Sequence, residues 1–127
     1  MFDELKKYKE TDHFFLKSTD SLTTVCNAPA SKSGVYIIFA LKNGRIELVQ
    51  IGCSNENEGI RYQIIKEQLF IKSKIKQENI EALDIYWYVT QTAKATDDPQ
   101  MVTARVLKTH NEIYGHSPRW NRVNKTH

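Results

Sequence analysis

Three polar side chains in this 127-residue sequence stand where they could act on a bound molecule: a phenol, a guanidinium and an amide. Tyr36 lies in a run of β-branched and aromatic residues, Arg61 lies near the start of an amphipathic stretch, and Asn121 follows Pro118 near the chain end. A cation near a helix start is unfavourable for the helix dipole, which favours a binding role for Arg61. Structural alternatives stay open, because Tyr36 can be a packed aromatic and Asn121 a turn residue.

A predicted β-hairpin carries Tyr36. Residues 35–39 have high β-propensity and are apolar on both faces, which is typical of a strand in the middle of a covered sheet. Asn43 and Gly44 supply the positive φ angles of a tight turn. We therefore expect residues 46–51 to form a second strand, antiparallel to the first.

Arg61 lies on a predicted helix that follows the hairpin. Apolar residues recur at three- and four-residue steps from residue 60 to about residue 71, which is the stripe of an amphipathic helix. The hairpin and this helix would bring Tyr36 and Arg61 to one edge of a small sheet. Lys72 and Lys74 follow, either as a solvated helix end that suits the dipole or as a patch that contacts phosphates.

The order of these features resembles the signature of the GIY-YIG nuclease superfamily. The residues that carry the resemblance are Gly-Val-Tyr at 34–36, Gln-Ile-Gly at 50–52, Arg61, and Pro-Arg-Trp-Asn at 118–121. The first triplet is nearly intact, whereas the second retains only Ile-Gly. The resemblance implies a DNA endonuclease that uses a divalent metal, Mg²⁺ or Mn²⁺.

The resemblance also implies a role for individual residues. Tyr36 would activate water, Arg61 would bind the phosphate and Asn121 would support the site. Gln50 stands where the family has a second tyrosine, and it can hydrogen-bond but cannot act as a base. Gln50 and Gly52, together with Lys72 and Lys74, are the predicted substrate-binding residues.

The metal ligand is the main departure from the family pattern. The resemblance implies a glutamate on the last helix, and Thr103 occupies the corresponding position. A threonine cannot replace a carboxylate ligand of a hard cation. Glu56 and Glu58 precede Arg61 and are weak alternative ligands, since acidic loop residues are usually solvated. The site residues therefore suggest a weakened nuclease, or a catalytically inactive module that binds nucleic acid or another protein.

The rest of the chain completes a single α/β (α+β) domain. Residues 83–90 form a predicted third strand, and residues 99–114 form a predicted helix that Asp98 caps and Gly115 ends. With a short N-terminal helix, this gives the order αββαβα around a three-stranded antiparallel sheet flanked by helices. Residues 1–30 would be an extension packed on a domain at 31–127, and residues 17–33 would be a loop.

Composition bears on the partner, the state of the cysteines and the location of the protein. The net charge of +3 and a pI near 8.8 are compatible with a DNA partner but are common in proteins without one. Cys26 and Cys53 lack neighbours at metal-ligand spacing and are expected to be reduced. No apolar run reaches the length of a membrane span and no signal-peptide core is visible, so we expect a cytoplasmic protein without a membrane partner. An interaction module unrelated to nucleic acid is the third reading.

Overall fold

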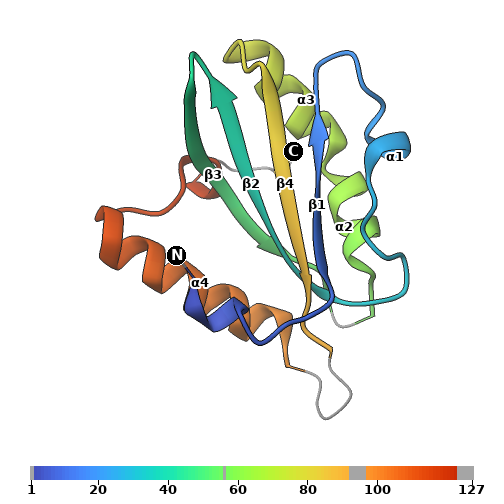
Figure 1. The fold of residues 1–127 in the computed structure, drawn as a ribbon, viewed down its shortest axis with the longest axis vertical. Coiled ribbons are helices and arrows are strands. Elements are labelled where there is room, and N and C mark those ends of the chain that lie inside the picture. Colours follow the sequence, from blue (N-terminus) through green and yellow to red (C-terminus); the bar gives the residue numbers. More distant parts are fainter. Residues whose placement is uncertain (1, 56, 92–96, 123–127) are drawn as a thin grey trace.

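A computed structural model describes residues 2–55, 57–91 and 97–122, and its centre is an antiparallel sheet of four strands (Figure 1). The strands lie in the order β1-β4-β2-β3. The elements along the chain are η1 (Asp3–Leu5), β1 (Thr11–Leu16), α1 (Leu22–Val25), β2 (Gly34–Lys42), β3 (Arg45–Cys53), α2 (Ile60–Lys66), α3 (Gln68–Gln77), β4 (Ala82–Val89), α4 (Pro99–Tyr114) and η2 (Arg119–Arg122).

The N-terminal region differs most from the prediction. The expected N-terminal helix is only the short 3-10 turn η1, and the segment after it is β1, which pairs with β4. The sheet therefore has four strands where three were predicted. In β1, Phe14 and Leu16 are buried and Phe15 is exposed, an alternation that fits a strand with one covered face. The predicted loop at 17–33 contains the short helix α1.

The hairpin is confirmed. β2 and β3 pair antiparallel, and Asn43 and Gly44 have φ angles of 53° and 74° at the turn. β2 lies between β4 and β3, and its residues up to Ile38 are buried on both faces. The expectation of a central strand in a covered sheet is thereby met.

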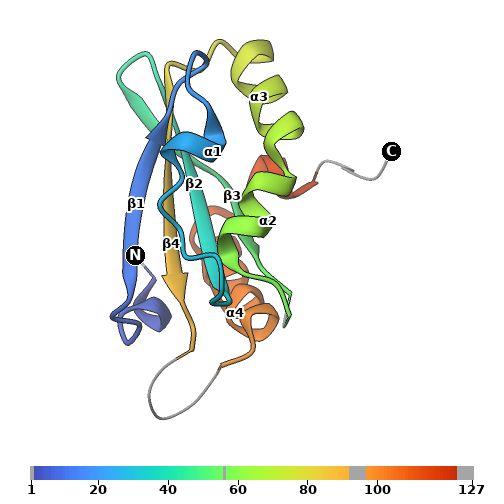
Figure 2. The ribbon, with the colours of Figure 1, turned by 90° about the vertical axis from the view of Figure 1, so that its right-hand side faces the viewer.

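The helix predicted over residues 60–71 is two helices. α2 ends at Lys66, and α3 begins at Gln68 and continues to Gln77 (Figure 2). Glu67 separates them with φ −94° and ψ 9°. Leu69, predicted to lie on the apolar stripe, is 82% exposed. Glu67 occupies the inward position instead.

The last strand and the last long helix match the prediction closely. β4 buries alternate residues, and α4 spans Pro99–Tyr114 as expected. The Asp98 side chain accepts a hydrogen bond from the Gln100 backbone N–H at 3.0 Å, and Gly115 has a φ of 78°. Ile113, in the last turn of α4, is exposed.

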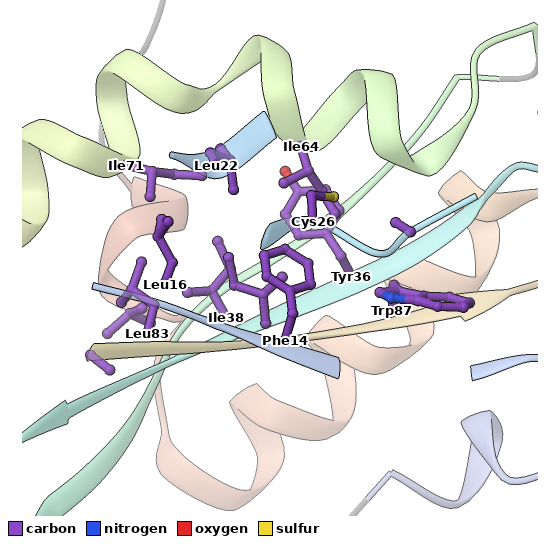
Figure 3. Packing of buried hydrophobic residues seen from close by; sticks show 14 of the residues in the cluster. Phe14, Leu16, Leu22, Cys26, Tyr36, Ile38, Ile64, Ile71, Leu83 and Trp87 are labelled. Carbon is purple, nitrogen blue, oxygen red and sulfur yellow. The ribbon is translucent and has the colours of Figure 1, made fainter. Parts of the chain in front are cut away.

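Each face of the sheet carries its own hydrophobic layer. Successive residues of β2 point to opposite faces, so Tyr36 and Ile38 belong to one layer, and Val35 and Ile37 belong to the other. We call these the α2/α3 face and the α4 face, after the helices that cover them. Figure 3 shows the first layer, with Phe14, Leu16, Leu22, Cys26, Tyr36, Ile38, Ile64, Ile71, Leu83 and Trp87 labelled. η1 and α4 cover the second layer with Phe2, Leu5, Tyr8, Val102 and Val106.

Among the described residues, no helix has the length and apolar character that crossing a membrane requires.

Candidate functional site

Tyr36 belongs to a buried polar cluster beneath the junction of α2 and α3. Its side chain is 1% exposed, and its hydroxyl donates a hydrogen bond to Glu67 Oε2. Gln50 Nε2 donates to the Tyr36 hydroxyl at 3.3 Å and to Glu67 Oε2 at 3.1 Å. We call Tyr36, Gln50 and Glu67 the Tyr36 cluster. It links two neighbouring strands to the helix junction above them.

The environment keeps Tyr36 protonated. Burial, and then the negative charge of Glu67, raise the pKa of the Tyr36 hydroxyl well above its ordinary value. A phenol acts as a base only after it has lost its own proton. At neutral pH the Tyr36 hydroxyl is therefore a hydrogen-bond donor to the carboxylate.

Gly52 leaves the space that the Tyr36 ring occupies. The two residues are directly opposite in the β2–β3 pair. A Cβ atom at Gly52 would lie 2.4 Å from both Cζ and the hydroxyl oxygen of Tyr36, well inside van der Waals contact. The absence of a side chain at Gly52 thus has a packing explanation, separate from its predicted role in substrate binding.

Asn121 is fixed to the same part of β3. Its Oδ1 accepts a hydrogen bond from the Ile51 backbone N–H at 2.9 Å, and its Nδ2 donates to the Ile51 carbonyl at 2.8 Å. The neighbouring Trp120 is buried, and its indole N–H donates to Glu78 at 3.1 Å. The structure therefore brings Asn121 next to the strand segment that faces Tyr36.

Arg61 makes a different set of contacts. Its Nη2 donates to the Thr23 carbonyl at 2.6 Å, and its Nη1 donates to the Cys26 carbonyl at 2.5 Å. These carbonyls belong to α1 and its C-terminal end. The guanidinium thus holds the α1 segment against α2, whereas Tyr36 and Asn121 are engaged at β3.

The two predicted phosphate-binding lysines also have partners within the protein. Lys72 Nζ donates to the Ser18 carbonyl at 2.9 Å and to the carbonyl of Asp20. Lys74 Nζ lies 4.0 Å from Glu78 Oε2 and 5.7 Å from the centre of the Phe70 ring. Lys72 thus ties α3 to the segment before α1, whereas the contacts of Lys74 lie within α3 and its C-cap.

The residues considered as metal ligands do not assemble a site with Tyr36. Thr103 is buried on α4, which packs on the opposite face of the sheet from the Tyr36 ring. Glu58 Oε2 lies 3.5 Å from Lys66 Nζ, and Glu56 lies outside the described residues. Among the residues that the structure describes, no three His, Cys, Asp or Glu side chains are grouped closely enough to hold an ion. The Tyr36 cluster offers a single carboxylate, a donor set that does not fit Mg²⁺ or Mn²⁺.

The sequence reasoning overlooked Glu67, although the pattern contains a signal for it. Ile60, Ile64, Glu67 and Ile71 are spaced by four, three and four residues, so Glu67 shares the inward phase of the helical stripe. Acidic side chains are seldom buried without a partner. An acid in this phase therefore predicts a polar partner beneath the helix, and the partners are Tyr36 and Gln50.

Comparison of the chain with protein-family models, curated proteins and solved structures gives no match. The assignment of a function therefore depends on the geometry above.

Proposed function

We propose that this protein is a GIY-YIG-like domain that works by binding a partner and does not hydrolyse phosphodiesters. The order β2-β3-α2-α3-β4-α4, followed by Asn121 against β3, supports the family resemblance. In such a domain the residues of a former active site keep the fold together.

The contacts of Arg61 carry this proposal. A phosphate-binding arginine needs its N–H groups directed at the ligand. Here two guanidinium nitrogens donate to the carbonyls of Thr23 and Cys26 at 2.6 Å and 2.5 Å. Each of these nitrogens already donates to the α1 segment, so the guanidinium is engaged in holding α1 against α2. The protonated, buried Tyr36 gives further support, because a water molecule bound at the protein surface cannot reach its hydroxyl.

Incubation of the purified protein with supercoiled plasmid and Mg²⁺ or Mn²⁺ tests the proposal. We expect no nicking above the level of the Tyr36→Phe and Arg61→Gln variants, which serve as controls for a contaminating nuclease. Nicking by the wild-type protein that both substitutions abolish would refute it.

A weakened nuclease is the second candidate, and the contact between Tyr36 and Glu67 favours it. Glu67 is half-buried, and its carboxylate could take the proton that Tyr36 would have to lose. If this candidate is correct, Glu67→Gln lowers the nicking rate as much as Tyr36→Phe does, while Glu81→Gln, an exposed acid before β4, leaves it unchanged.

The contacts of the cations expected to bind phosphates favour a protein partner over DNA. Arg61 and Lys72, two of the cations expected to contact phosphates, are bound to backbone carbonyls, and Arg119 is paired with Glu47 at 2.8 Å and Glu78 at 2.6 Å. Non-specific DNA binding needs cations that can replace counterions. A mobility-shift titration that shows tight, salt-sensitive DNA binding lost in Arg61→Gln would identify DNA as the partner instead.

A further inference from the structure

In the part of the chain that the structure describes, the α4 face of the sheet is only partly covered. η1 and α4 cover one end of it, and a groove of about 620 Å³ remains over the rest. Strands β1, β2, β3 and β4 all contribute to its lining, and Phe15 and Ile46 there are 50% and 70% exposed. In Figure 1 the strand segments that line the groove lie above α4. The groove is on the opposite face from the Tyr36 cluster.

An acidic side chain sits at the centre of this apolar surface. Asp84 is on β4, and the residues directly opposite it in the two neighbouring strands are Phe15 on β1 and Phe39 on β2. Residues opposite each other in adjacent strands point to the same face. The carboxylate of Asp84 thus lies between two phenylalanines, with Tyr86 two residues further along the same face.

The carboxylate is shielded from water. The Asp84 side chain is 15% exposed, and its Oδ1 lies 2.8 Å from Nδ1 of His13, which stacks on Tyr86 with ring centres 4.7 Å apart. Lys6, the other charged residue that lines the groove, is paired at 2.8 Å with Asp3 at the exposed N-terminal end. The centre of the groove is therefore aromatic and negatively charged.

This combination selects an arginine side chain. A guanidinium is planar, so it can stack on phenylalanine rings while it donates two parallel hydrogen bonds to a carboxylate. A phosphate group would be repelled by Asp84, which argues against nucleic acid. A second copy placed symmetrically over the same groove would bring its own Asp84 toward this one.

We propose that the groove binds a segment of a partner protein in which one arginine is flanked by apolar residues. The guanidinium lies over Asp84 between Phe15 and Phe39, and the apolar neighbours cover Leu41 and Ile46. The inference rests on the proposed function, since it gives the partner of that binding domain its chemistry.

Amide chemical-shift titration of the ¹⁵N-labelled full chain tests the proposal. The probe is a blocked pentapeptide, Leu-Leu-Arg-Leu-Leu, compared with the same peptide carrying citrulline, which has the shape of arginine without its charge. We expect shift changes centred on Phe15, Phe39, Asp84 and Tyr86, and affinity about tenfold weaker for the citrulline peptide.

Single substitutions test the contribution of the Asp84 carboxylate to peptide binding. Asp84→Asn is expected to lower the affinity for the arginine peptide about tenfold and to leave the affinity for the citrulline peptide unchanged. Glu112→Gln, which changes an exposed acid on α4, should alter neither affinity. Phe15→Ser, which removes an exposed ring, should lower the affinity for both peptides. The amide spectrum of each variant reports whether it is folded.

Several results would overturn the inference. They are equal affinity for the two peptides, shift changes away from the groove, no effect of Asp84→Asn, or the same residues responding to an oligonucleotide or to protein concentration alone. Plasmid nicking would refute the proposed function and not this site, because the two assays report on opposite faces of the sheet.

Discussion

At the scale of single residues, Gly52 and the Tyr36 ring fit closely against each other. The ring is held by Glu67 and Gln50, so it cannot easily move away from a new side chain. The position of Gly52 on β3, the orientation of the Tyr36 ring and the junction of α2 and α3 are therefore coupled through these contacts.

Gly52→Ala is expected to destabilise the protein by about 1–3 kcal/mol, the usual cost of forcing extra atoms into a packed core. The added Cβ would meet Tyr36 at 2.4 Å. Urea unfolding measures the loss. In a Tyr36→Leu background the same substitution should cost far less, because leucine lacks the ring atoms that the Cβ meets. An equal cost in both backgrounds would contradict this account.

Tyr36→Phe is expected to change how stability depends on pH. The folded protein binds the phenol proton more tightly than the unfolded chain, whose tyrosines have a pKa of about 10. The stabilisation is therefore complete below pH 10 and is lost as the pH rises from there toward the raised pKa.

The variant lacks this contribution, so its stability should be lower by about 1–3 kcal/mol at pH 7 but should fall less steeply above pH 10. Tyr8, Tyr86 and Tyr88 also have raised pKa values and contribute equally to both proteins. Urea midpoints from pH 7 to 11 give the comparison. Parallel curves for the two proteins would show that the Tyr36 pKa is not raised.

At the scale of elements, η2 closes the sheet edge that β3 presents. Asn121 hydrogen-bonds to both backbone groups of Ile51, and Trp120 enters the core beside it. The remaining exposed part of β3, toward the hairpin turn, has Arg45 and Glu47, and charged side chains on an edge oppose pairing with another chain.

Asn121→Ala is expected to lower the free energy of unfolding by about 1–3 kcal/mol, because buried backbone groups of Ile51 lose their partners. Amide hydrogen exchange in β3 should quicken, while exchange in β1 stays near the wild-type rate. Asn111→Ala, at an exposed position on α4, is the matched control. Unchanged exchange at Ile51 in Asn121→Ala would show that the contact is not stabilising.

At the scale of the whole molecule, residues 2–16 contribute to the core of the protein. β1 covers the edge of β4, and Phe2, Leu5 and Tyr8 pack on the α4 face. Phe14 and Leu16 fill the layer beneath α1 and α3. The sheet and both of its layers would be incomplete without this segment.

The fragment 31–127, the domain predicted from the sequence, is therefore expected not to fold cooperatively. Circular dichroism and urea unfolding of the fragment measure this, with a 10–127 fragment as a control that keeps β1 and loses η1. The control should retain a cooperative transition at lower urea. Full cooperativity of the 31–127 fragment would establish residues 1–30 as a dispensable extension.

The sequence predicted those parts of the fold that have local signals. The turn at Asn43 and Gly44, the alternation in β4 and the caps of α4 each lie within a few neighbouring residues. β1 was missed because its partner, β4, lies far along the chain. The pairing of two strands that are far apart in the chain cannot be read from the sequence of either strand alone.

The candidate site was predicted in part for a similar reason. Residue types and order pointed to Tyr36, Gln50, Gly52 and Asn121, which the structure brings together around the end of β3. The partners of Arg61 are backbone carbonyls, and backbone groups are the same in every residue type. Glu67 could have been found only by looking for a polar residue that lies on the same side of the helix as Ile60, Ile64 and Ile71.

The strand order has a consequence for how the protein is made. β1 leaves the ribosome first, yet it pairs with β4, and His13 meets Asp84 across 71 positions of the chain. At about 5–20 residues per second, several seconds pass between the emergence of the two segments. During that interval β1 has no strand to pair with, so the nascent chain offers chaperones an unpaired segment that contains Phe14, Phe15 and Leu16.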